Sequence, residues 1–118
     1  MVNKERVWLW IEALRSGKFE QARDTLREGN KYCCLGVACE VAIRNGLELR
    51  QDGLHSYSYD GKFSNLGTLP QSVVDWYGLP AASPQLGQFS ATDRNDERKE
   101  SFNEIAAHIE KEYFNEDS

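Results

Sequence analysis

The segment from Tyr32 to Ile43 is almost continuously apolar and contains all three cysteines of the chain. On a helical wheel that starts at Cys34, only Glu40 and Arg44 lie opposite the apolar side. The apolar side consists of Leu35, Ala38, Cys39, Ala42 and Ile43. A helix that is apolar over most of its circumference is buried on nearly all sides. We therefore expect a central, nearly buried helix that the rest of the chain must cover.

A glycine interrupts this apolar helix at Gly36. Glycine costs about 1 kcal/mol of helix propensity relative to alanine, so we expect it to let another element approach closely. Asn45-Gly46 is a typical helix stop. The residues assigned a structural role are Cys33, Cys34, Cys39 and Gly36, with the cysteines as reduced thiols of a cytosolic protein.

Two amphipathic helices are expected near the ends of the chain. The first begins at Asn3, a typical N-cap residue, and its core stripe is Val7, Trp10, Ile11 and Leu14. The last follows the capping box Ser101-Phe102-Asn103-Glu104, and its stripe is Phe102, Ile105, Ala106, Ile109 and Tyr113. We expect the last helix to pack on the cysteine helix.

Trp8 and Leu9 do not belong to the first stripe, because they lie roughly 100° and 200° around the helix from Val7. Two interpretations remain open. A loop folds over these two side chains, or they form an interface with a partner.

The remaining segments are rich in turn signals. Residues 18–32 permit a helix or a hairpin, and we favour a short helical turn followed by a hairpin that leads into the cysteine helix. Residues 47–50 and 54–59 are expected strands, with the turn Asp60-Gly61 returning through Lys62-Phe63. The whole chain, 1–118, is thus predicted to be one small α+β domain with a small antiparallel sheet.

A third helix is expected to start at Thr68-Leu69-Pro70, with Pro70 in its first turn, and to end at Gly78. Residues 79–98 contain two prolines and a charge run, so we predict a long surface loop there. Residues 115–118 are predicted to be a frayed tail.

Charge and hydropathy exclude several classes of protein. The net charge of −5 argues against binding to duplex nucleic acid, which needs concentrated lysine and arginine. No apolar run approaches the roughly 18 residues of a membrane span, and the first residues do not form a signal peptide. We therefore expect a cytoplasmic protein.

Motifs along most of the chain resemble those of a set of small proteins encoded by bacteriophages and prophages. These proteins carry W-x-x-A-L-R-S-G-K, then C-C-L-G-V-x-C, and near the end S-F-x-E-I-A-x-x-I-E. The matching residues here begin at Trp10, Cys33 and Ser101. The resemblance implies a phage origin, hence a location in the host cytosol, and a small α+β fold.

Few residues point to catalysis or to metal binding. The chain has no G-x-S-x-G elbow, P-loop or H-E-x-x-H motif. A Cys33 or Cys34 nucleophile with His55 as its base is the covalent alternative. The carboxylates considered for a metal or a water are Asp75, Asp93 and Asp96. We expect a binding protein rather than an enzyme, with no metal and no cofactor.

Aromatic side chains are the better candidates for recognition, because bases stack on such rings for about 1–3 kcal/mol each. The predicted ligand-binding residues are Tyr57, Tyr59, Trp76, Tyr77 and Arg94. Our leading hypothesis is a phage protein that counters host defence by sequestering a nucleotide-derived immune signal, with Trp8 and Leu9 as the interface of a homo-oligomer. The alternatives are an acidic inhibitor of a host protein and a hydrolase of a signalling nucleotide.

Overall fold

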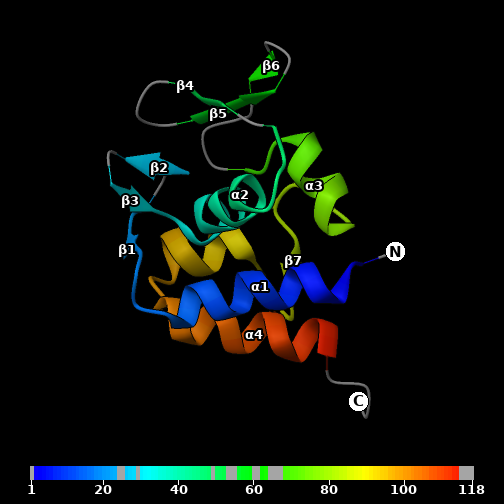
Figure 1. Cartoon of the computed structure of the whole chain (residues 1–118). Coiled ribbons are helices and arrows are strands. Elements are labelled where there is room, and N and C mark those ends of the chain that lie inside the picture. Colours follow the sequence, from blue (N-terminus) through cyan, green and yellow to red (C-terminus); the bar gives the residue numbers. More distant parts are fainter. Residues whose placement is uncertain are drawn as a thin grey trace.

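The computed structural model describes residues 2–23, 26–28, 30–48, 50–52, 56–59, 62–63 and 68–114. They form one α+β domain (Figure 1) in which helices enclose a single apolar core, and small sheets lie at its edges. This architecture confirms the fold class predicted from the sequence. The expected tail, 115–118, lies outside the described residues.

Helix α1 (Lys4–Arg15) begins at Asn3, whose side chain accepts a hydrogen bond from the backbone N–H of Arg6. Its predicted core stripe is confirmed, because all four residues are buried. Trp8 and Leu9 are exposed. The interpretation in which a loop folds over these two side chains is therefore wrong for the described residues.

Helix α2 (Cys34–Arg44) is the predicted central helix and is buried from Cys34 to Ala42. Trp10 of α1 donates its indole N–H to the Cys34 carbonyl at 2.9 Å, and the Tyr77 hydroxyl donates to the Ala38 carbonyl at 2.7 Å. A Cβ on Gly36 would lie 1.9 Å from the Leu26 carbonyl oxygen. Glycine is therefore required for the close approach predicted at this position.

Residues 18–32 form strands β1 (Glu20–Gln21), β2 (Arg27–Glu28) and β3 (Lys31–Tyr32). The predicted hairpin is confirmed, since β2 and β3 pair antiparallel and β3 leads into α2. The predicted helical turn before it is wrong. Its first residues instead pair parallel to β3 as β1, which satisfies their backbone groups in a sheet.

A second sheet lies at the top of Figure 1 and has the order β4-β5-β6, all antiparallel. Its strands are Arg50–Asp52, Ser56–Tyr59 and Lys62–Phe63. The first strand thus begins at the end of the range expected for it. The predicted turn Asp60-Gly61 lies outside the described residues, although the pairing of β5 with β6 agrees with a hairpin.

Helix α3 (Gln71–Tyr77) follows Pro70 and ends at Gly78, whose left-handed φ of 72° favours glycine. The prediction of a long surface loop at 79–98 is wrong. It contains the hairpin β7 (Gln85–Leu86) and β8 (Phe89–Ser90), followed by a π-helix, η1 (Asp93–Glu97). The physical reason is burial: Arg94 and Asn95 turn into the protein.

Helix α4 (Phe102–Phe114) begins at the predicted capping box, in which Ser101 Oγ accepts from the Glu104 N–H and Glu104 Oε1 accepts from the Ser101 N–H. Its first four stripe residues are buried. The helix runs antiparallel along α1 (Figure 1), which is its main neighbour. The expectation that it packs mainly on the cysteine helix, α2, is therefore wrong.

Candidate functional site

Of the predicted ligand-binding aromatics, the structure describes the side chains of Trp76 and Tyr77, and both are engaged within the protein. The Arg6 guanidinium lies 4.4 Å from the centre of the Trp76 ring and donates a hydrogen bond to the Trp76 carbonyl at 2.8 Å. Tyr77 is fully buried, and burial raises the pKa of its hydroxyl. One face of Trp76 is thus already covered, and Tyr77 is a core residue. Tyr57 and Tyr59 belong to β5, but their side chains lie outside what the structure describes.

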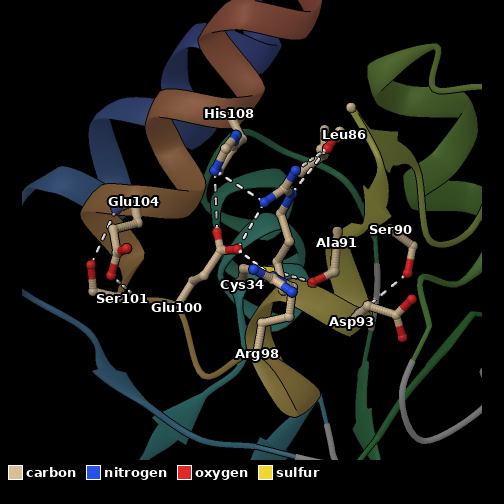
Figure 2. Close-up of polar contacts among 12 residues, drawn as sticks. Cys34, Leu86, Ser90, Ala91, Asp93, Arg98, Glu100, Ser101, Glu104 and His108 are labelled. Carbon is tan, nitrogen blue, oxygen red and sulfur yellow. Dashed lines mark hydrogen bonds and ion pairs between the residues drawn. The ribbon is translucent and has the colours of Figure 1, made fainter.

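Arg94 contacts a different group of residues, of which Leu86, Glu100 and His108 are labelled in Figure 2. Its side chain is buried, and its Nη1 donates to Glu100 Oε2 at 2.7 Å and to His108 Nε2 at 3.0 Å. Its Nε donates to the Leu86 carbonyl at 3.0 Å, and Nη2 also donates to this oxygen. Because these bonds occupy each guanidinium nitrogen, Arg94 is not presented to a phosphate in the way predicted.

Arg98 and Phe89 complete this group. We call it the Arg94 cluster, and it consists of Arg94, Glu100, His108, Arg98 and Phe89. Arg98 lies over the Phe89 ring at 4.1 Å, and its Nε is 3.4 Å from Glu100 Oε2. His108 Nε2 is 3.4 Å from Glu100 Oε1, an oxygen that is buried and accepts no hydrogen bond. The Glu100 carboxylate therefore lies among two arginines and a histidine. The cluster holds η1 and β7 against α4.

The neighbouring Asn95 connects the same π-helix to α2. Its Oδ1 accepts from the Cys34 N–H at 3.2 Å and from Gln21 at 2.8 Å, and its Nδ2 donates to the Ala22 carbonyl at 2.8 Å. The free N–H groups of a helix start need such acceptors. The buried polar residues of η1 thus have a structural explanation.

Sequence reasoning missed Glu100 and His108. The available signal was weak, because Glu100 is six residues and His108 fourteen residues from Arg94. A π-helix also breaks the ordinary helical spacing that would have placed Arg94 on one face.

All three cysteines are buried and unpaired. Burial raises the pKa of the Cys33 thiol to about 12 and raises those of Cys34 and Cys39 above their ordinary value. Cys33 Sγ accepts from the Gly36 N–H and so caps α2. Thiolates are the reactive form of cysteine, so this environment disfavours a nucleophile. The proposed base, His55, lies outside the described residues.

The candidate carboxylates Asp75 and Asp96 and the backbone of Asp93 make local hydrogen bonds. Asp75 accepts from Gln71 at 2.8 Å, Asp96 accepts from Asn95 at 2.7 Å, and the Asp93 N–H donates to Ser90. In the described ranges, no three His, Cys, Asp or Glu side chains gather in a way that would hold a metal ion. No helix in this part of the chain is both long and apolar enough to cross a bilayer.

The outer side of α1 has the composition of an interface. Trp8 and Leu9 are 37% and 38% exposed and are the large hydrophobic side chains that stand out from the described surface. The Trp8 ring contacts the edge of Phe114 at 5.4 Å between centres. An open hollow beside Phe114 is lined by α4 residues Ala107, Glu110 and Lys111. An exposed tryptophan next to a shallow hollow is suited to contact with a macromolecule.

The chain belongs to the family described as Domain of unknown function (DUF8296), whose model matches residues 2–114. No curated protein and no solved structure matches it.

Proposed function

We propose that this protein acts by binding a partner protein through the outer side of α1. The observation that carries the proposal is the exposure of Trp8 and Leu9 side by side on a helix whose opposite face is fully buried. Tryptophan is among the residues that contribute most to binding energy at protein interfaces. Neighbouring apolar side chains that stay exposed offer surface that a partner protein can cover.

The resemblance to phage proteins gives a reason for such binding. A small phage protein in the host cytosol counters a defence or housekeeping protein by occupying its surface, and this requires affinity without turnover. The buried thiols and the occupied guanidinium of Arg94 support binding over catalysis.

Sequestration of a nucleotide-derived signal is the weaker hypothesis. Of its predicted contacts, Trp76 has one face under Arg6, Tyr77 is buried and Arg94 is engaged internally. It stays a prediction that calorimetry with cyclic nucleotides and ADP-ribose derivatives can test.

The proposal is tested by capture from a bacterial lysate on immobilised protein. We expect a stoichiometric protein partner that is retained by the wild type and lost by the variant Trp8→Ala, Leu9→Ala. The matched control is Glu28→Ala, Lys31→Ala, which changes two exposed residues of the β2-β3 hairpin. Equal capture by both variants, or release of small molecules alone on heating, would contradict it.

A further inference from the structure

Four of the exposed residues of α1 form a line along the helix, and the exposed Lys4 and Arg15 lie near its two ends. Glu5, Trp8, Leu9 and Glu12 are all exposed and follow the spacing i, i+3, i+4, i+7, which places them on one face of the helix. We call them the outer stripe. Trp8 and Leu9 thus have the carboxylate of Glu5 one turn before them and that of Glu12 one turn after them.

The basic residues of α1 contact other groups. Arg6 stacks on Trp76, Arg15 pairs with Glu110 at 2.9 Å, and Lys4 lies 6.0 Å from the Phe114 ring centre. Within the described residues, Glu5 and Glu12 belong to no ion pair. The chain as a whole carries a net charge of −5. The outer stripe therefore presents two apolar side chains between two exposed carboxylates that belong to no ion pair among the described residues.

We propose that the occupant of the outer stripe is a basic amphipathic helix of the partner protein. This inference rests on the proposed function and names the chemistry of its partner. A helix that lies along α1 offers apolar residues at i, i+3 and i+4 to Trp8 and Leu9. Lysine or arginine residues one turn to either side then meet Glu5 and Glu12 and fix the register.

A second copy of this chain fits the outer stripe less well. Two α1 helices paired antiparallel about an axis between Trp8 and Leu9 place Glu5 of each copy opposite Glu12 of the other. Like charges in register oppose association. The charge pattern therefore favours a different, basic partner over self-association.

The test uses two synthetic 18-residue amphipathic peptides as probes. Both carry leucine at the spacing i, i+3, i+4, i+7, and the polar positions are lysine in one peptide and glutamate in the other. Calorimetry at low salt measures affinity, and amide chemical shifts identify the helix that is contacted. We expect the Leu/Lys peptide to shift amides of α1 and to bind at least about tenfold more tightly than the Leu/Glu peptide.

Charge reversal sharpens the test. Glu5→Lys, Glu12→Lys should weaken the Leu/Lys peptide by about tenfold, whereas Glu28→Lys, Glu97→Lys, with the same change in net charge, should leave its affinity within about twofold. Equal binding of both peptides, or an equal effect of the two double variants, overturns the basic-helix inference. The inference is also overturned if the wild type forms a dimer and Glu5→Lys weakens or strengthens that dimer, because the stripe would then bind a second copy of this chain.

These results are distinguishable from failure of the proposed function. If Trp8→Ala, Leu9→Ala abolishes capture of the lysate partner while charge reversal does not, the interface stands and the basic helix is wrong. If neither variant changes capture, the interface itself is wrong.

Discussion

Helix α1 carries two stripes with the same spacing on opposite faces. The inner stripe, Val7 to Leu14, is buried, and the outer stripe, Glu5 to Glu12, is exposed. Each contains one tryptophan. The inner Trp10 is fully buried, packs on Tyr77 and donates its N–H to the Cys34 carbonyl, whereas Trp8 touches Phe114 and is 37% exposed.

The difference shows how one short helix separates folding from recognition. Trp10 buries its ring and satisfies its polar atom, so it contributes to the stability of the folded chain. Trp8 leaves apolar surface in water, and this surface gives free energy only when a partner covers it. A Trp8 variant that lost as much stability as a Trp10 variant would contradict this division of roles.

The largest expected effect is that of Trp10→Ala. It removes a fully buried ring and leaves the Cys34 carbonyl without its indole donor. We expect a loss of about 5 kcal/mol in the free energy of unfolding, at the upper end for large-to-small core changes. The matched variant Trp8→Ala should lose less than about 1 kcal/mol. Urea unfolding followed by circular dichroism measures both, and equal losses would contradict the division of α1.

The next largest effect concerns a buried arginine–glutamate pair, Arg94 with Glu100, compared with an exposed one, Arg15 with Glu110. Arg94→Met leaves the buried Glu100 carboxylate without its 2.7 Å partner, although Arg98 remains 3.4 Å away. We expect a loss of about 3 kcal/mol, the lower end for breaking a buried pair.

Arg15→Met is the control, since it removes an exposed partner of Glu110 and should cost less than about 1 kcal/mol. The same urea titration applies. If Arg94→Met were as mild as Arg15→Met, the Arg94 cluster would not be what holds η1 to α4.

The sequence predicted the parts of the fold that depend on local pattern. Periodic apolar residues located α1, α2 and α4, and the caps at Asn3 and Ser101 located two of their starts. Gly36 was recognised because a glycine inside an apolar helix needs a reason, and the Leu26 carbonyl supplies it.

The parts that depend on distant partners could not be predicted. Arg94 looked like an exposed loop cation because its acceptors, the Leu86 carbonyl and Glu100, are brought to it by a hairpin and a π-helix. Trp76 looked free because Arg6, which covers it, is 70 residues away. For the outer stripe, periodicity excluded Trp8 and Leu9 from the core, but only the folded chain showed that no described loop covers them.

A smaller effect is expected at Cys39, which is fully buried on α2. Cys39→Ser places a hydroxyl in the core and should cost about 1–3 kcal/mol, and Cys39→Ala should cost less despite a small cavity. The thiol itself should react with a bulky reagent only as the protein unfolds. Zinc-dependent and equal losses in both variants would show instead that the sulfur is a ligand.

The smallest effect is a pH dependence at the start of α4. The hydrogen bond from the Ser101 N–H lowers the pKa of the exposed Glu104 carboxyl below its ordinary value of 4.5. A lowered pKa means that the native state favours the carboxylate, so this contribution is present above pH 4.5 and is lost as the pH falls through the native pKa.

Removing the Ser101 hydroxyl tests this coupling. Ser101→Ala removes the hydroxyl that accepts from the Glu104 N–H, so the pKa of Glu104 should move back toward 4.5 as the capping box loosens. Titration of the Glu104 side-chain carbon by NMR measures the shift, and an unchanged titration curve would mean that the backbone bond alone sets this pKa.

The most direct test of the central claim places a photo-crosslinking amino acid, p-benzoylphenylalanine, at position 9 of the full chain in bacteria. The same probe at position 28, where the exposed Glu28 stands in β2, is the control. If the outer stripe is the binding surface, irradiation should give one discrete protein adduct at position 9 and none at position 28. Adducts at both positions, or no adduct at position 9 in a protein that is folded, would contradict it.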